Sequence, residues 1–274
     1  SSFVFKIFKT GIDDVNKRYE RLKFDNSDKR SNDLKLAEAF ENGLEAIPLG
    51  RKIFASIFPR PNYSFRWDGL EKFGLLSGFA SRVTLDHAYS STYRRRWKIT
   101  PTGGEVTEGQ QVSYAFSPLV GVNITFKPLG QGNLTGGFRY GTSTLYDLTP
   151  AAQKITESNT SDITVTANYS RVGFEIPFFG LSLSNDLDIT FSYSLTKNNR
   201  RLFDFSKFPF KKDGDPLEGT NRTVIEPRIR YTLSARVSAS IYYKYTRFKP
   251  DAAGSRVPGS TINEGGLDIR VQIT

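Results

Sequence analysis

The chain has 274 residues, a formal net charge of +10, 14% aromatic residues, no Cys or Met, and one His. Without Cys it has no thiol nucleophile, disulfide or thiolate metal site, and one His is too few for a multi-histidine metal centre. A Ser-His-Asp triad is also a poor prospect, so we expect no enzyme, no cofactor and no bound metal.

The first 60 residues have a helical period. Val15, Tyr19 and Leu22 recur at helical spacing, and a second helix is predicted over 32–46. The apolar opening, 3–8, is interpreted as the end of a strand. No segment has the roughly 18–20 apolar residues that a membrane-spanning helix needs, and the first residues lack the basic start and apolar core of a signal peptide.

From residue 61 onward the hydrophobic period changes from 3.6 to 2, which is typical of strands with one apolar and one polar face. The alternating segments are 63–68, 82–86, 122–126, 138–140, 163–170, 187–196, 228–233, 237–246 and 267–274. The sequence therefore divides into a helical and loop insertion over 1–60 and a run of strands over 61–274.

The polar positions of these strands decide between a soluble sandwich and a membrane barrel. They are Ser, Thr, Asn, Asp and Arg with few Lys, which suits a hydrated lumen, and the pattern over 182–197 is long enough to cross a bilayer. Aromatic residues near strand ends suit interfacial girdles; they are Tyr146, Phe174, Phe203, Phe205 and Phe248. We expect an all-β fold, a segment of an antiparallel transmembrane β-barrel in a bacterial outer membrane.

The predicted connections alternate in length. Short or medium links are expected at 127–132, 173–181 and 234–236, and longer ones at 94–110, 198–221 and 249–262, with an intermediate one at 147–153 that alternates with the short links in the same way. Outer-membrane barrels have short periplasmic turns and longer external loops. The longer connections are therefore expected outside the cell, with the helical insertion on that side or in the pore mouth.

The strand count indicates an incomplete barrel. Nine strands is an odd number, whereas bacterial single-chain barrels have an even number; the segment 3–8 would raise the count to ten. We expect the remaining strands to come from upstream sequence or from another chain.

Three segments resemble the C-terminal region of the SprA/Sov family. Residues 58–70 read FPRPNYSFRWDGL, residues 85–93 read LDHAYSSTY and residues 116–123 read FSPLVGVN. They follow the family's order, and the ending GGLDIRVQIT, 265–274, is similar to its last strand. The resemblance extends over 58–274.

The resemblance implies a very wide barrel of about 36 strands, the outer-membrane translocon of the type IX secretion system in Bacteroidetes and relatives. It also implies several partners: a PorV-like shuttle barrel at a lateral opening, a periplasmic plug protein, and secreted proteins with C-terminal sorting domains. The expected function is thus the wall of a channel that exports folded proteins. A TonB-dependent receptor or porin-like barrel for small solutes is the alternative, and a barrel enzyme is a weaker third.

Basic residues on the polar positions suggest a hydrated, basic conduit wall, although ordinary ion pairing explains them equally well. They are Arg66, Arg82, Arg139, Arg228, Arg230, Lys244 and Arg270. A second cluster, Arg94, Arg95, Arg96 and Lys98, is interpreted either as a solvated loop at a strand end or as a contact that forms charge-assisted bonds to lipopolysaccharide phosphates. No recognition helix or aromatic platform accompanies this charge, so we expect no nucleic-acid partner.

Other residues receive structural interpretations. His87 is expected to be a hydrogen-bonded strand residue, and the pair Asp186 and Asp188 to face arginines across the polar side. Pro118 within a strand predicts a bulge because it cannot donate to the ladder. The pairs Gly136-Gly137 and Gly265-Gly266 also predict bulges or bends.

Overall fold

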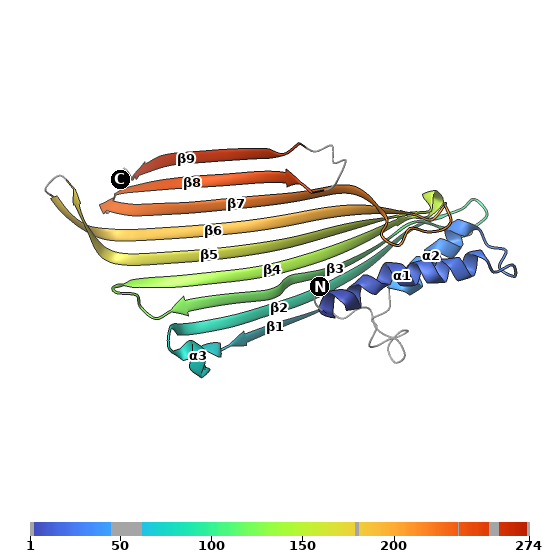
Figure 1. Ribbon diagram of the computed structural model, residues 1–274, viewed down its shortest axis with the longest axis horizontal. Helices are drawn as coiled ribbons and strands as arrows, with labels where there is room; N and C mark the ends of the chain where they lie inside the picture. Colours follow the sequence, from blue (N-terminus) through green and yellow to red (C-terminus); the bar gives the residue numbers. More distant parts are fainter. Residues whose placement is uncertain (1–2, 45–61, 179–180, 235, 252–257, 273–274) are drawn as a thin grey trace.

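The computed structural model describes residues 3–44, 62–178, 181–234, 236–251 and 258–272. Two long helices precede a single nine-stranded antiparallel sheet, whose strands lie side by side in chain order from β1 to β9 (Figure 1). The all-β fold class expected from the alternating pattern is confirmed. In the described residues β1 and β9 form the two edges of the sheet and do not pair with each other.

Eight of the nine predicted strand segments fall within one observed strand, and the ninth, 267–274, extends past the last observed strand, which ends at Val271. The strands are β1 Tyr63–Asp68, β2 Ala80–Ile99, β3 Glu105–Phe126, β4 Gly132–Thr149, β5 Lys154–Phe178, β6 Leu181–Asp204, β7 Asp215–Ser234, β8 Val237–Pro250 and β9 Ser260–Val271. The last strand begins earlier than predicted, and its expected final residues, 273–274, lie outside the described residues.

The strands are longer than their apolar alternation. The long loops predicted at 94–110 and 198–221 are largely wrong, because β2 and β3 pair as far as Ile99 and Glu105, and β6 continues to Asp204. Polar side chains do not stop a ladder whose backbone groups remain paired. The hydrophobic pattern therefore marked only the part of each strand with an apolar face.

The connections sort to two ends of the sheet, as an antiparallel meander requires. The β2–β3, β4–β5, β6–β7 and β8–β9 connections share one end, which we call the loop end. The opposite end has the short β3–β4 link and the β1–β2 connection, which contains two short helical turns that the sequence analysis missed, η1 Leu70–Lys72 and α3 Gly74–Ser77. The predicted sorting of the connections to two ends is confirmed, whereas their sorting by length is not, because the β1–β2 connection, 69–79, is longer than the β2–β3 connection, 100–104.

The helices are α1 Phe3–Lys23 and α2 Asn32–Leu44. The interpretation of 3–8 as a strand end is wrong, because this segment forms the first turns of α1. A six-residue apolar run fits both periods, and continuity with the helical pattern that follows decides between them. The expected end of the second helix, at residue 46, lies outside the described residues.

The helices form a dry core with the sheet at the loop end. α2 lies against β3 and the turn η2 Pro150–Ala152, and α1 packs on α2 (Figure 1). The fully or nearly buried side chains of this core come from both helices and four strands; they include Val15, Tyr19, Leu36, Phe40, Leu44, Val112, Tyr146, Leu148, Ile155 and Phe203. Burial of such side chains supplies most of the stability of short helices.

Two glycines allow the helices to approach closely. A Cβ on Gly43 would lie 2.8 Å from the backbone nitrogen of Val15, and a Cβ on Gly11 would lie 2.6 Å from Leu44 Cδ2. Gly43 costs about 1 kcal/mol of helix propensity relative to Ala. Its place at the crossing point gives the physical reason for its presence within α2.

The predicted bulges have mixed outcomes. The β2–β3 and β3–β4 registers both shift near Pro118, so the bulge predicted there is confirmed. The bulges predicted at Gly136-Gly137 and Gly265-Gly266 are wrong, because both pairs lie in regular ladders. A Cβ on Gly266 would meet the Tyr242 ring at 2.7 Å, so this glycine makes room for a cross-strand aromatic side chain.

Candidate functional site

The register separates the side chains of the sheet into two faces, because residues directly opposite in a ladder project to the same side. One continuous row runs from β1 to β8 on what we call the apolar face; it consists of Trp67, Leu85, Val122, Phe138, Val165, Tyr193, Ile225 and Tyr245. The adjacent row, on the polar face, consists of Arg66, Asp86, Gly121, Arg139, Thr164, Ser194, Val224 and Thr246.

The apolar face has its apolar side chains in a band that crosses all nine strands. On β6 the band extends over 187–195, and the same face becomes polar beyond it, at Asn185 and Lys197. These nine residues of β6 match the roughly 9–11 residues that a tilted transmembrane strand needs to cross a bilayer.

The apolar band is exposed in the described structure. Phe191 is 38% exposed on a central strand, and Ile241 and Leu267 are 62% and 61% exposed near one edge. Soluble monomers rarely expose a continuous apolar surface of this extent, and one that does marks an interaction with another protein or with a membrane. The band is therefore the main candidate for a functional surface.

All seven basic residues predicted for a lumen wall lie on the polar face. Register places Arg230 opposite Asp188, and Arg270 opposite Ser238. The pairing of Asp188 with an arginine strand position agrees with the structural interpretation of that carboxylate. The alternation of polar and apolar residues in the sequence therefore placed these seven basic residues correctly on one face of the sheet.

Ion pairs account for four of these seven cations. Arg66 lies 3.4 Å from Asp68 and 3.7 Å from Asp86, and Arg82 also reaches Asp68. The other two pairs are Arg228 with Glu226 at 3.5 Å and Lys244 with Glu264 at 3.9 Å. Arg139 instead donates to the Ser117 hydroxyl at 2.9 Å. Ion pairs thus account for most of the seven basic residues on the polar face, which favours the ion-pairing interpretation.

A hollow of about 430 Å³ opens beside the β3 bulge. Charged and polar groups line one side of it, including Arg66, Asp86, Asn123 and Arg139. Asn123 donates to Asp86 at 3.2 Å, so the polar groups here largely satisfy one another. In the part of the chain that the structure describes, no group of His, Asp and Glu side chains is arranged to hold a metal ion.

The members of the basic cluster on β2 differ in their partners and in the face of the strand to which they project. Arg95 lies 3.7 Å from Glu105, and Lys98 lies 3.1 Å from Glu108. Arg94 and Arg96 have no carboxylate within 4.0 Å among the described residues, and Arg96 lies across Gly109. The cluster is near the loop end, beyond the apolar band, and successive members project to opposite faces of β2.

His87 is a hydrogen-bonded strand residue. Its Nδ1 lies 2.7 Å from the Leu119 carbonyl oxygen at the bulge, and its Nε2 lies 3.2 Å from the Tyr63 hydroxyl. The ring also packs against Phe116 at a centroid distance of 5.7 Å. This arrangement matches its structural interpretation.

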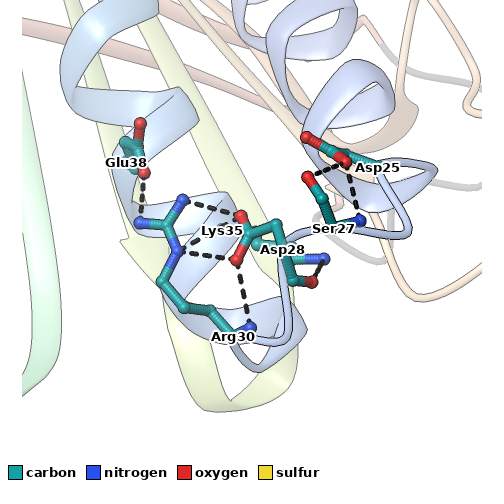
Figure 2. A network of polar contacts seen from close by, with 6 residues as sticks. All are labelled: Asp25, Ser27, Asp28, Arg30, Lys35 and Glu38. Atoms are coloured by element: carbon teal, nitrogen blue, oxygen red, sulfur yellow. Dashed lines mark hydrogen bonds and ion pairs between the residues drawn. The ribbon is translucent and has the colours of Figure 1, made fainter.

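The turn between α1 and α2 contains a network of polar contacts (Figure 2). Arg30 bridges Asp28 at 2.7 Å and Glu38 at 2.5 Å, and the nearly buried Lys35 donates to the Asp28 carbonyl at 2.8 Å. Hydrogen bonds from the Arg30 side chain and backbone lower the pKa of Asp28 to about 2. The network holds the turn against the first two turns of α2.

The aromatic contacts of α1 were not found by sequence reasoning. The Tyr19 ring packs against Phe205 at 5.6 Å and Phe210 at 5.5 Å, in the β6–β7 connection. Burial, with a smaller contribution from Asp33, raises the pKa of Tyr19. Phe205 appeared in the sequence as a girdle residue, but its buried ring instead joins the sheet to the helices.

A scan against protein-family models finds no match to this chain, and a search of curated proteins finds none. Among the described residues, no helix has the length and apolar character needed to span a membrane.

Proposed function

We propose that the chain is part of the wall of a very large bacterial outer-membrane channel that exports folded proteins. The observation that carries the proposal is the apolar band, which crosses nine strands on one face and lies opposite a polar face with paired charges. Lipid would cover the band, and the polar face would line a hydrated passage. The proposal that the cargo is folded protein is based on the segments that resemble the SprA/Sov translocon family.

Lipid explains the band better than water does. Transfer of a large apolar side chain out of water is worth roughly 1.5–3 kcal/mol when complete, and the band contains many that are a third or more exposed, such as Phe138 and Ile229. Its extent on β6, residues 187–195, fits the number of residues with which a tilted strand crosses a hydrocarbon layer. The band is thus the surface on which the proposed membrane location depends.

The open sheet supports a wide barrel over a small one. A self-contained barrel of nine or ten strands would curl until its first and last strands paired, whereas β1 and β9 lie at opposite edges (Figure 1). Unpaired backbone groups in lipid cost several kcal/mol each. Strands from outside this sheet would therefore have to cover both edges.

The position of the helices refines the proposal. Leu148 and Ile155, which contact the helices, share a face with the apolar band, and the β4–β5 register between them and Phe138 and Val165 is unbroken. In a barrel with the band outside, α1 and α2 would lie against the outer surface of the wall beyond the bilayer. This favours an external position over the pore mouth.

A photo-crosslinking experiment tests whether protein passes along the polar face. A photoreactive amino acid at Thr190 should crosslink to a cargo arrested during export, whereas the same group at the neighbouring Phe191 should crosslink to lipid. If Thr190 gives no cargo adduct while its substitution alters the uptake of small solutes, the receptor or porin-like alternative replaces this proposal. Crosslinking of both positions to the same soluble partner would contradict the membrane location.

Epitope tags test which side of the membrane the loop end faces. Gly103, in the β2–β3 connection, and Gly130, in the β3–β4 link, both adopt positive φ in turns at opposite ends of the sheet. Antibody should label intact cells tagged at Gly103 and not those tagged at Gly130. Labelling of Gly130 alone would invert the proposed orientation.

A further inference from the structure

α1 is longer than the helix on which it packs. It has 21 residues and α2 has 13, and the two lie antiparallel with Gly11 beside Leu44, the last residue of α2. The first eight residues of α1 therefore continue past that point. Leu44 also fixes the level on the sheet, because its carbonyl accepts a hydrogen bond from the Tyr114 hydroxyl on β3.

These eight residues point from the loop end toward the apolar band. Tyr19 lies beside Phe205 at the loop end, and Gly11 lies at the level of Tyr114. From its C-terminus to its N-terminus, α1 therefore runs along the strands away from the loop end (Figure 1). A further eight residues at 1.5 Å each cover about 12 Å. That equals three or four strand residues, at about 3.3 Å each.

The descent ends at the upper border of the band. Three or four residues farther from the loop end than Tyr114, β3 reaches Phe116–Pro118 and β4 reaches Tyr140. On β4 the apolar face changes there, from Thr142 to Tyr140. The helices pack on this same face of the sheet. The backbone of 3–10 is therefore placed at the border of the band, on the side that the proposed function assigns to lipid.

The sequence of this segment suits a membrane interface. Residues 3–10 read FVFKIFKT, with five apolar residues, two lysines and no acidic residue; the first acidic residue of the chain is Asp13. Apolar residues interspersed with lysine are typical of helices that lie at the headgroup boundary, where lysine attracts anionic lipids.

We propose that the first two turns of α1 anchor the helical pair in the interfacial layer of the membrane, with anionic lipid headgroups as their partner. The inference depends on the proposed membrane location of the sheet. It assigns the helices a second attachment, in addition to their packing at the loop end. The anchor would hold the loop-end core against the outer leaflet.

Depth-dependent quenching tests the anchor, since a chain without Cys accepts a single labelled Cys at any chosen position. The protein, extracted with the strands that complete its barrel, is labelled with an environment-sensitive fluorophore at Val4→Cys, Phe191→Cys or Lys29→Cys. It is then reconstituted into 4:1 phosphatidylcholine:phosphatidylglycerol vesicles, with doxyl groups at carbon 5 or carbon 12. Val4→Cys should lose most of its fluorescence with the shallow quencher, Phe191→Cys with the deep one, and Lys29→Cys with neither.

The outcomes separate the anchor from the proposed function. If Phe191→Cys is quenched and Val4→Cys behaves like Lys29→Cys, the anchor is wrong and the membrane wall stands. If neither Val4→Cys nor Phe191→Cys is quenched, both proposals fail. In the double variant Lys6→Glu, Lys9→Glu, quenching at position 4 should fall while quenching at position 191 stays constant; unchanged quenching at position 4 would overturn the role of anionic headgroups.

Discussion

One face of the sheet has two different environments along the same strands. On β4, Leu148 is fully buried and Phe138, ten residues away on the same face, is 41% exposed. On β6 the contrast recurs between Phe203, at 4% exposed, and Phe191, at 38%. The helices supply the apolar cover at the loop end, whereas the band has no such cover within the described residues.

This difference in burial shows that two parts of one face of a sheet can lie in different environments. At the loop end, apolar residues of the helices match apolar residues of the strands, which gives a dry core of the kind found in soluble domains. In the band, the same periodicity continues without a second layer. Under the proposed function, water surrounds the first region and lipid covers the second.

The largest effect is expected from a substitution in the core that the helices form with the sheet at the loop end. Phe40 is fully buried in α2, and Phe40→Ala should lower the free energy of local unfolding of the helical pair by about 3–5 kcal/mol. Hydrogen exchange of the amides in α1 and α2 measures this loss. Leu34→Ala on the same helix, where the side chain is 40% exposed, is the matched control and should change exchange little. Equal effects would show that the helices do not depend on this core.

The next expected effect concerns the uncovered region. An arginine on the lipid face of a barrel costs roughly 2–4 kcal/mol at the bilayer midplane, so Phe191→Arg should reduce assembly strongly. Ser192→Arg, one residue away on the polar face, should assemble almost normally. Heat-modifiable migration of the assembled protein on gels measures both. Equal tolerance of the two substitutions would argue for a soluble fold and against the membrane wall.

A smaller effect is expected where the two helices cross. A Cβ on Gly43 would press on the backbone of Val15, which cannot rotate away, so Gly43→Ala should cost about 1–3 kcal/mol by overpacking. Faster proteolysis within α1 would report the loss. Gly74→Ala is the control, because a Cβ at Gly74 would have no other atom within 4 Å among the described residues. No change for Gly43→Ala would show that the helices can separate without penalty.

The smallest expected effect depends on pH. The pKa of Asp28 is about 2 in the folded chain and 3.8 ordinarily, so its carboxylate stabilises the turn above about pH 4 and loses this effect as the pH falls toward 2. In pepsin digests at pH 4, Asp28→Asn should be cut faster than the wild type between α1 and α2. As the pH approaches 2, the two rates should converge. A constant ratio of rates would mean that the Asp28 charge does not stabilise the turn.

Sequence reasoning found the sheet because alternation is a local property. Ile189, Phe191 and Tyr193 show their common face without any knowledge of their neighbours. The same rule placed Arg228 and Arg230 on the opposite face. It gave nine strands and two faces, and it found the ends at which the connections gather.

Long-range contacts decided what the sequence left open. Tyr19 donates to Gln153, 134 positions away in the chain, and Tyr114 donates to Leu44, 70 positions away. No local pattern contains such pairs, so the side of the sheet that the helices cover was decided only by the fold. Residues 3–8 are helical because they continue into the rest of α1. Likewise, β2 and β6 are longer than predicted because their ladders with the neighbouring strands continue past the apolar residues.

The sequence by itself determined which side chains share a face, because a strand turns every second residue the same way. The tertiary structure alone decided what covers that face, since the cover comes from helices docked by contacts distant in sequence. It also decided that the sheet remains open at β1 and β9 in the described residues. Curvature accumulates over many ladders, and no single strand encodes it.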